Sequence, residues 1–378
     1  MNIIEISKKC VGCGACVDIC PVNSLKLNCD ENGFYKPEVS NETCVDCGKC
    51  IKCCPVVNQE VADRNRKFYY GWNNDETVRK NSSSGGVFSL LAEKILSEGG
   101  VVFGARYSED YKSVVMSSTE ESDLDQLRRS KYCQSFSNGM YRKAQSYLND
   151  GKKVMIVGTP CQISAARKFF KNQENLLLVD FLCGGVTPST VFAEYTEYLE
   201  KKYNSKIKSI NMRDKSRGWT KASVRVEFEN GRVYSSRYQF DYYYYYYCTP
   251  YLKNDACLSC SFTDHNDADI TIADFWGYKK ANVEKDEKGI SLICTYTKKG
   301  QVYVDLMKEN MTLCSLEASY AAYGYKEKSH TPQAIAKREA FLSNVKSASF
   351  IQAARNDYFK NGKLGVLTKI IARKVLRK

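Results

Sequence analysis

The feature that most constrains this chain is a cysteine motif that occurs twice near its N-terminus. Four cysteines spaced by two, two and three residues, and followed by proline, begin at Cys10 and again at Cys44. Bacterial ferredoxins bind 4Fe–4S clusters with this spacing, and the fourth cysteine of each run ligates the cluster of the other run. The expected ligands are Cys10, Cys13, Cys16 and Cys54 for cluster I, and Cys44, Cys47, Cys50 and Cys20 for cluster II.

Other uses of these cysteines fit less well. Zinc also binds cysteine pairs two residues apart, but two complete runs that end in Cys-Pro favour iron–sulfur clusters. Cys53 is off the pattern and is expected to be a bystander, although it leaves two candidates, Cys53 and Cys54, for the fourth ligand. Cys29, between the two runs, is expected to be a small core residue. The chain has only two histidines, which disfavours a histidine-based zinc site or catalytic triad.

The composition restricts the class of protein. Eighteen cysteines in 378 residues exceed ordinary usage, yet disulfide scaffolds are small and secreted. The N-terminus has no apolar signal segment and no stretch approaches 18 apolar residues, so we expect a cytoplasmic protein with reduced thiols. The net charge of +13 lies largely near the C-terminus. No nucleic-acid motif accompanies it, and no nucleic-acid partner is expected.

Composition changes along the chain predict its domains. Residues 1–57 form a ferredoxin-type domain with two clusters, and the polar residues 58–67 read as a linker. Residues 68–345 alternate strand-like and helix-like segments, typical of an α/β domain. Residues 346–378 form a basic tail whose last part, 363–378, has apolar residues at helical spacing. This tail would pack on its own domain or make weak contact with an anionic membrane surface or a partner.

A Ser/Gly-rich loop, 82–86, precedes an expected helix over 87–97. Unpaired N–H groups and the positive end of the helix dipole make such a loop a candidate phosphate site. Serine is also a common helix N-cap, so the loop alone leaves both interpretations open.

Two buried strands, 153–157 and 176–181, flank a helix, and each is followed by a cysteine. A strand–helix–strand unit makes the strands parallel, and ligands bind at the carboxyl edge of such sheets. Cys161 and Cys183 should therefore converge there. With Cys257 and Cys260 they would form a third 4Fe–4S site; the alternative is that all four are free thiols.

Several segments together resemble a known family, the coenzyme F420 hydrogenase/dehydrogenase beta subunits, in the bacterial form with a fused ferredoxin domain. The matching segments are 82–88, 130–135, 158–162, 180–185 and 257–277. The resemblance implies an α/β FAD-binding domain with a mostly parallel sheet and its own 4Fe–4S cluster on the four cysteines above. The residues it implies at FAD are Ser84, Gly85, Gly86, Lys131, Tyr132, Gln134, Ser135, Gly158, Thr159 and Pro160.

The function implied by this resemblance is that of an FAD-dependent oxidoreductase. Electrons from a ferredoxin or another redox protein would pass through the clusters to FAD and on to a small-molecule acceptor, F420-like or other. Because clusters carry single electrons, a flavin is the logical converter to two-electron chemistry. Lys131 and Asp274 would tune the flavin or move a proton; Asp274 fits a cap or turn role equally well. The alternatives are a non-catalytic electron-transfer subunit and a ferredoxin fused to an inert domain.

Two further segments are predicted from their local pattern. Six consecutive tyrosines, 242–247, are expected to form a packed edge strand, with an aromatic wall over flavin or substrate as the alternative. The charged segment 213–219 is expected to be a solvated loop, with contact to an anionic ligand as the alternative. The acceptor, the direction of electron flow and the oligomeric state do not follow from the sequence.

Overall fold

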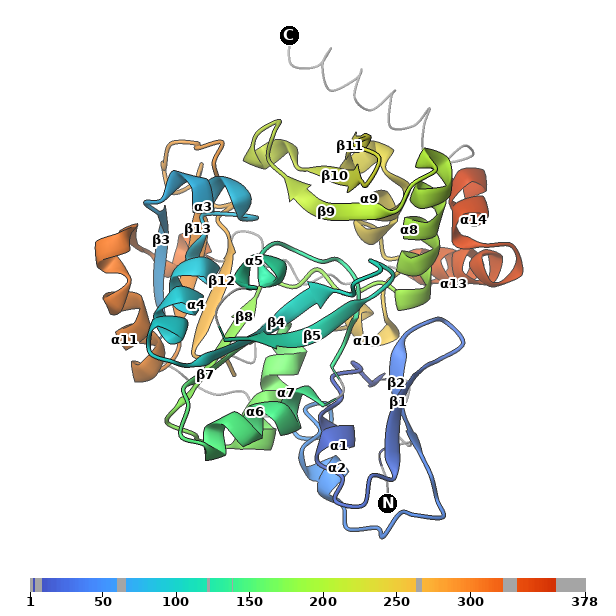
Figure 1. Cartoon of the computed structure of the whole chain (residues 1–378), viewed down its shortest axis with the longest axis horizontal. Coiled ribbons are helices and arrows are strands. Elements are labelled where there is room, and N and C mark those ends of the chain that lie inside the picture. The colour runs from blue at the N-terminus through green and yellow to red at the C-terminus, as the bar shows by residue number, and fades with distance from the viewer. Residues whose placement is uncertain are drawn as a thin grey trace.

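The computed structural model describes residues 3, 9–59, 66–120, 123–137, 139–262, 267–321 and 332–357. It contains an N-terminal module, a nine-stranded sheet covered by helices, and a three-stranded sheet that packs with the C-terminal helices (Figure 1). This mixed arrangement confirms the predicted α/β class. Within the described ranges, no helix is both long and apolar enough to cross a membrane.

The N-terminal module is built around one antiparallel hairpin, β1 (Leu25–Cys29) and β2 (Tyr35–Val39). A short helix follows each cysteine loop: α1 (Ala15–Asp18) and α2 (Lys49–Lys52). Both helices begin after a glycine with positive φ, 79° at Gly14 and 69° at Gly48. Glycine adopts this left-handed conformation without steric cost, so the chain turns sharply between the cysteines.

Two predictions about this module need correction. Cys29 is exposed at the end of β1 rather than buried. The hairpin projects toward α8 (Ser189–Tyr203), so the Sγ of Cys29 lies 3.3 Å from Ser189 Oγ. Asn58, placed in the linker, belongs to the module, because its side-chain amide donates to the carbonyl of Ile51 at 2.8 Å. Residues 60–65 of the predicted linker lie outside the described residues.

The large sheet has the strand order β14-β3-β13-β12-β8-β7-β4-β5-β6. Its strands are β3 (Lys67–Asn73), β4 (Val101–Tyr107), β5 (Val114–Thr119), β6 (Ser135–Phe136), β7 (Val154–Gly158), β8 (Leu176–Phe181), β12 (Ile270–Asp274), β13 (Ser291–Thr295) and β14 (Met311–Leu316). The central strands β12, β8, β7 and β4 are parallel, and so are β5 and β6. The strands β13, β3 and β14 pair antiparallel with their neighbours, and β5 pairs antiparallel with β4. The prediction of a mostly parallel sheet was therefore wrong. Strands such as β4 and β5 are joined directly, without the crossover that parallel pairing requires.

The predicted strand–helix–strand unit is confirmed. β7 and β8 are parallel and are joined by α7 (Pro160–Phe170). The helix starts with a capping box in which the side chains of Thr159 and Gln162 satisfy each other's backbone N–H groups, and Pro160 occupies the first turn. β12 adds to β8 in parallel, so the carboxyl ends of all three strands meet at one edge.

Alternating side chains of the central strands bury both faces of the sheet. One face packs against α6 (Met140–Asn149) and α7, and through them against the N-terminal module (Figure 1). The other face packs against α4 (Val87–Ser97), α5 (Leu124–Leu127) and α11 (Lys298–Leu306). The short helices α3 (Glu76–Asn81), α10 (Asp255–Leu258) and α12 (Ala318–Ala321) complete the connections. The module and the sheet thus share one continuous core.

The second sheet orders β11 (Val233–Arg237), β10 (Ser223–Phe228) and β9 (Ile207–Asp214). The tyrosine run next to it forms a helix, α9 (Tyr242–Tyr247), rather than the expected edge strand. The Asp241 carboxylate caps it by accepting from Tyr244 N at 2.7 Å, and three of the tyrosines are buried. The cap and the packing override the preference of tyrosine for strands.

The C-terminal helices are part of the domain rather than a separate tail. α13 (Pro332–Ser347) and α14 (Phe350–Asp357) contact each other, and α14 packs on α8 and α9 with Phe350 fully buried. The predicted boundary at residue 346 is therefore wrong. The amphipathic segment 363–378 and both histidines, His265 and His330, lie outside the described residues.

Candidate functional site

The first cysteine loop is buried, and the fourth cysteine of the second run lies beside it. Cys13 and Cys16 are each 8% exposed and Cys54 is 9% exposed. The charges of Cys10, Cys13, Cys16 and Cys54 interact, and Gly12 N donates to Cys10 Sγ at 3.4 Å. The structure therefore brings together the four thiols predicted for cluster I.

The second cysteine loop opens to the surface. The four thiols predicted for cluster II line one small cavity: Cys20, Cys44, Cys47 and Cys50. Ser24 N donates to Cys20 Sγ at 3.3 Å, and exposed Val45 stands at the rim. The exchange of the fourth cysteines between the runs is thus present in the geometry.

The electrostatics of the buried loop fit an iron cluster. Burial and the neighbouring thiols raise the pKa values of Cys13 and Cys16 well above the ordinary range. Four thiolates packed this closely repel one another, and the positive charge of bound iron offsets that repulsion. Burial, with help from Cys54, raises the pKa of Cys53 to about 12, and its Sγ donates to the Cys50 carbonyl at 3.4 Å. Cys54 interacts with Cys10 and Cys13, which makes Cys54 the better placed ligand.

The module is fixed to the large domain at the start of α6. The Asp18 carboxylate accepts from Gly139 N at 2.7 Å and from Tyr141 N at 2.8 Å, where the helix dipole favours a negative charge. Arg142 donates to the carbonyls of Asp18 and Cys20 at 2.5 and 2.8 Å. These contacts hold the first cysteine loop against α6.

Gln134 makes a second connection to the module. Its side-chain oxygen accepts from Tyr35 N at 2.7 Å, and its amide nitrogen donates to the carbonyls of Val11 and Tyr35. The side chain is 3% exposed. A residue implied at FAD thus has its whole side chain directed toward the N-terminal module.

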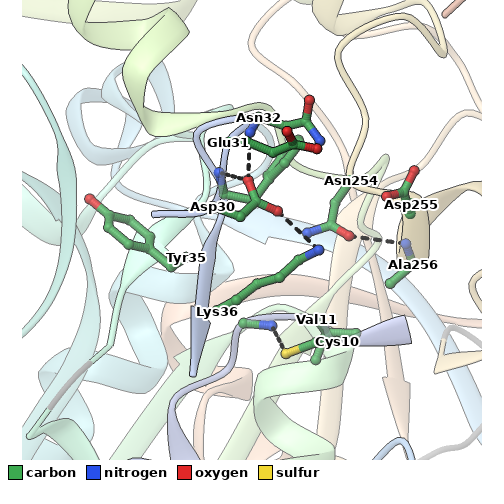
Figure 2. A network of polar contacts seen from close by, with 12 residues as sticks. Cys10, Val11, Asp30, Glu31, Asn32, Tyr35, Lys36, Asn254, Asp255 and Ala256 are labelled. Atoms are coloured by element: carbon green, nitrogen blue, oxygen red, sulfur yellow. Dashed lines mark hydrogen bonds and ion pairs between the residues drawn. The ribbon is translucent and has the colours of Figure 1, made fainter. Parts of the chain in front are cut away.

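A group of polar residues from the hairpin and from the segment before Cys257 is drawn in Figure 2. Lys36 pairs with Asp30 at 2.9 Å, and its charge favours the thiolate of Cys10. In Figure 2 the side chain of Asn254 points toward this ion pair. Asn254 is the N-cap of α10, where its side chain accepts from Ala256 N at 3.0 Å. The Nδ2 of Asn254 is buried without a hydrogen-bond partner among the described residues, so no hydrogen bond joins Asn254 to this ion pair.

The four cysteines of the predicted third site also converge, at the carboxyl edge of the parallel strands. Burial raises the pKa of Cys161 well above its usual range, and Cys183, Cys260 and Cys257 raise it further. Gly185 N donates to Cys183 Sγ at 3.3 Å, the same residue spacing as Gly12 to Cys10. Among the described residues, no three His, Cys, Asp or Glu side chains are grouped to hold a single metal ion. A cubane is larger than one ion and holds its thiolates further apart.

Aromatic side chains connect this four-cysteine site to the charged residues Arg213 and Asp274 at the same edge of the sheet. Tyr247 lies near Cys183 and stacks on Tyr132 with centroids 4.1 Å apart and planes at 21°. Tyr132 in turn lies within reach of the charges of Arg213 and Asp274. The tyrosine helix, although not a strand, thus contributes to an aromatic layer between the two groups.

Lys131 lies in the segment between α5 and β6, where its Nζ donates to the Arg128 carbonyl at 2.6 Å. Burial and the nearby Arg129 lower the pKa of Lys131 to about 7, against the opposing effect of Asp125. Its ammonium lies 5.6 Å from the centroid of the Tyr107 ring. A lysine that titrates near neutral pH is typical of a functional site.

Asp274, the last residue of β12, is held by two partners. Arg213 pairs with its carboxylate at 2.9 Å, and Trp219 Nε1 donates to it at 2.6 Å. Arg213 is buried and Trp219 fully so; segment 213–219 is therefore not the solvated loop expected from its charges. Trp219 stacks on Trp276 with centroids 4.7 Å apart, and Trp276 is 37% exposed.

The loop 82–86 lies at the same edge, but most of its polar groups already have partners. Ser84 Oγ donates to the Ile290 carbonyl at 2.8 Å, and Gly85 N donates to Ser291 Oγ at 2.9 Å. Lys215 Nζ donates to the Ser84 carbonyl at 2.9 Å. Gly86, with φ 86°, is the N-cap of α4, and no side chain caps the helix.

The remaining residues implied at FAD lie on the cysteine side of the edge. Ser135 Oγ accepts from Gln162 Nε2 at 2.9 Å, and the hydroxyl of Thr159 lies 3.1 Å from Cys161 Sγ. The structure therefore separates the ten implied residues into two sets. One set lies near the residues around Asp274 and consists of Ser84–Gly86, Lys131 and Tyr132. The other set lies at the interface of the N-terminal module and the four-cysteine site and consists of Gln134, Ser135 and 158–160.

Comparisons with known proteins identify the family. The 4Fe-4S dicluster domain model matches residues 9–58. The models for the N-terminal and C-terminal parts of the coenzyme F420 hydrogenase/dehydrogenase beta subunit match residues 68–140 and 151–319. The chain belongs to this beta-subunit family. The resemblance seen in the sequence and the predicted ferredoxin-type domain are thereby confirmed, and the chain is an iron–sulfur electron-transfer protein of this family.

Individual proteins are more distant. No curated protein matches this beta-subunit chain. Among solved structures, a chain of the xenon-derivatised F420-reducing NiFe hydrogenase complex from Methanosarcina barkeri is similar, with 16% identity and a TM-score of 0.46. The match covers 80% of this chain and 94% of that chain.

Sequence reasoning missed several residues of this site. Arg213 and Lys215 were assigned to a loop, and Asp18, Arg142 and Tyr141 were not singled out. No sequence signal marked Asp18, because its partners Gly139 and Tyr141 are 121 and 123 positions away in the chain. Arg213 carried none, since its partner Asp274 is 61 positions away in the chain.

Proposed function

We propose that this chain is an iron–sulfur flavoprotein oxidoreductase. It passes electrons between the two clusters of its ferredoxin domain and FAD, and from there to a two-electron organic acceptor. The observation that supports this most is a continuous series of groups. It runs from the exposed second cysteine loop, through the buried first loop and the four-cysteine site, to the group around Lys131 and Asp274.

The third cluster is the first element of this proposal. Cys161, Cys183, Cys257 and Cys260 supply four thiols, and Cys183 already accepts a backbone N–H as cluster ligands do. Lys253, 5% exposed, lies near Cys257 and would offset negative charge there. These features fit a cubane bound at the end of β7 and β8.

FAD is the second element. The N-terminus of α4, which no side chain caps, offers N–H groups to a diphosphate. Lys215, whose carbonyl partners include Ser84 O, and Arg213 add positive charge at the same edge. Trp276 and Phe181, each 37% exposed, offer apolar surface to a planar ring.

The residues around this position would control protons and orientation. FAD, when bound, converts single electrons into a two-electron reduction of an organic acceptor. Lys131 Nζ, with a pKa of about 7, can hold or release a proton at neutral pH. Arg213 and Trp219 fix both oxygens of the Asp274 carboxylate, which orients it at the end of β12. Asp274 therefore positions charge beside the site, and Lys131 is the better candidate for proton transfer.

Anaerobic purification, with iron, sulfide and flavin quantified together, tests the proposal. About twelve iron atoms per chain support three cubanes, and about eight leave only the ferredoxin pair. The variant Cys183→Ser should lose about four iron atoms, whereas Cys314→Ser, a half-buried cysteine on β14, should lose none. A preparation without flavin that also fails to bind added FAD would contradict the flavoprotein assignment.

A second candidate is an electron-transfer subunit that does no chemistry alone. The exposure of Trp276 and Phe181 favours it, because apolar side chains grouped at a redox site are also suited to being covered by another protein. Turnover of a small molecule by the isolated chain, supplied with a reduced ferredoxin, separates the two candidates. A bound flavin without any turnover would support the subunit role.

A further inference from the structure

The two inner cysteine sites approach each other through one buried helix pair. α1, which carries Cys16, contacts both α6 and α7, and α7 carries Cys161 as its second residue. Ser137 Oγ, just before α6, donates to the Cys13 carbonyl at 2.6 Å. The first cysteine loop and the third site are therefore separated by little more than the side chains between these helices.

Tyr141 occupies that space. It is fully buried and belongs to the same apolar cluster as Cys13 and Cys16. Its backbone N–H donates to Asp18 Oδ2 at 2.8 Å, and its hydroxyl donates to the Gln162 carbonyl at 3.4 Å. Gln162 is the residue after Cys161. Tyr141 therefore contacts the module at one end and the third cysteine site at the other.

The electrostatic environment of Tyr141 agrees with this position. Burial raises its pKa well above the usual range, and the nearby Cys13 and Cys161 raise it further. Phe169, with its ring centroid 5.3 Å away, closes one side of the ring. The ring therefore lies within the electrostatic reach of both cysteine sites, in a part of the core that water does not enter.

We propose that Tyr141 is the positioning residue through which electrons cross between the first cysteine loop and the third cysteine site. The inference rests on the third cluster of the proposed function. It orders the sites as second loop, first loop, Tyr141, third site. In each crossing, the reduced cluster of the first loop would be oxidised by the loss of one electron. Its ligands are Cys10, Cys13, Cys16 and Cys54. The cluster at Cys161, Cys183, Cys257 and Cys260 is reduced by that electron, and no proton or bond is exchanged.

The position of the second loop gives the order a direction in space. Cys47 is exposed and the cavity around it opens to the surface, whereas Cys13 and Cys16 are buried beside Tyr141. Of the two ferredoxin loops, the second lies nearer the surface, so a reduced redox protein can approach the second loop more closely than the first. The first loop therefore acts between the surface and the large domain.

The test uses the full-length holoprotein with Tyr141→Leu and Tyr141→Phe, and Tyr147→Phe as the control on the same helix. Tyr147 is half-buried and donates to the exposed Glu120 at 2.7 Å, and Glu120 belongs to neither cysteine site. Each protein is mixed anaerobically with a limiting amount of dithionite-reduced ferredoxin, frozen after increasing times, and examined by electron paramagnetic resonance. The signal of the third site is assigned beforehand from its loss in Cys183→Ser.

We expect the electron to reach the third site in the parent protein and in Tyr147→Phe. In Tyr141→Leu it should remain on the ferredoxin clusters for severalfold longer, with Tyr141→Phe in between because the ring is kept and the contact with Gln162 is lost. Iron content and the melting temperature are measured on every variant. If Tyr141→Leu loses iron or fails to fold, the result for Tyr141→Phe decides.

The outcomes separate this inference from the proposed function. About twelve iron atoms per chain with equal transfer times in all variants would overturn the role of Tyr141 and leave the third cluster intact. About eight iron atoms in the parent protein would overturn both.

Discussion

Two regions of the molecule differ in their exposure to solvent: the second cysteine loop, here called the outer end, and the residues around Lys131 and Asp274, here called the inner end. At the outer end, Cys47 and the neighbouring Val45, 60% exposed, lie at an open cavity. At the inner end, Arg213 and Trp219 are buried around Asp274, and burial lowers the pKa of Lys131 to about 7. The same iron–sulfur motif that is exposed in the second loop is buried in the first.

This difference shows that burial is decided by docking and not by the motif. The two cysteine runs have identical spacing, yet only the first lies against α6, where Asp18 and Arg142 hold it. An exposed cluster is suited to encounter with another protein, and a buried group with shifted pKa values is suited to chemistry away from water. In the proposed function, the molecule would combine one end for electron exchange with one end for proton and substrate control.

The largest expected effect comes from removing a ligand at the outer end. Cys47→Ser should abolish cluster II, lower the iron content by about four atoms per chain and stop reduction of the inner clusters by a ferredoxin. The fold should survive, because Cys47 is exposed and no core contact is lost. Iron analysis and stopped-flow reduction at the visible absorbance of the clusters provide the measurement.

Cys29→Ser is the matched control, since Cys29 is also exposed in the same module but lies outside both runs. It should keep all its iron and normal reduction. A Cys47→Ser protein that retained its full iron content would show that Cys47 is not a ligand of cluster II. Normal reduction of the inner clusters after loss of about four iron atoms would show that electrons do not enter at the outer end.

The next effect concerns the contact that joins the ends. Asp18→Ala removes a buried carboxylate that accepts from the N–H groups of Gly139 and Tyr141, leaving these donors unsatisfied. Hydrogen bonds to a charged group and the favourable helix dipole predict a loss of roughly 3 kcal/mol in the free energy of unfolding. Anaerobic urea denaturation measures it.

Asp150→Ala tests the same helix at its other end, where Asp150 follows the last residue of α6 and is exposed. A negative charge at a helix C-terminus is unfavourable, so this variant should be neutral or gain a few tenths of a kcal/mol. Equal losses in both variants would mean that Asp18 acts only as a generic surface charge and that the module is not anchored at α6.

Local patterns made the outer end predictable from the sequence. The cysteine spacing alone placed all eight ferredoxin positions, and the strand–helix–strand pattern alone placed Cys161 and Cys183 at one edge. In both cases the decisive residues are neighbours in the chain or are related by the parallel pairing of β7 and β8. Short-range rules suffice for such features.

The inner end was predicted less well because its contacts join distant segments. Arg213 reads as part of a charged loop, and only the pairing of β9 and β10 beside β12 brings it to Asp274. The tyrosine run has strand propensity, yet Asp241 and the packing of α14 make it a helix. Gln134 illustrates the same limit, since its partners Tyr35 and Val11 lie in another domain.

A smaller effect should appear in the pH dependence of stability. Because the folded pKa of Lys131 is about 7 and its unfolded value is higher, the unfolded chain binds more protons between these values. Stability therefore rises as the pH increases from about 7 toward 10. The groups near the Lys131 ammonium are Arg129, Asp125 and Tyr107, and the Lys131→Met substitution leaves all three unchanged. Lys131→Met should remove part of this rise in melting temperature, and Lys80→Met, an exposed lysine on α3, should not.

Lys215, for which burial also lowers the pKa to about 7, contributes to the same rise. Identical melting profiles for the parent protein and Lys131→Met from about pH 6.5 to about pH 9 would show that Lys131 is solvated. The inner end would then lose its main difference from the outer end.

The smallest effect is expected from the apolar surface at the outer end. Val45 is 60% exposed at the rim of the cavity of cluster II and contributes little to the core. Val45→Ser should change the free energy of unfolding by less than about 0.5 kcal/mol, but it removes apolar surface where a redox protein would approach. The rate of reduction at low ferredoxin concentration should fall modestly, while the rate at saturation stays the same, because the cluster is untouched. Val233→Ser, at the exposed β11 in the second sheet, should alter neither rate. If both variants behave alike, ferredoxin does not approach at Val45, and electrons enter at another part of the surface.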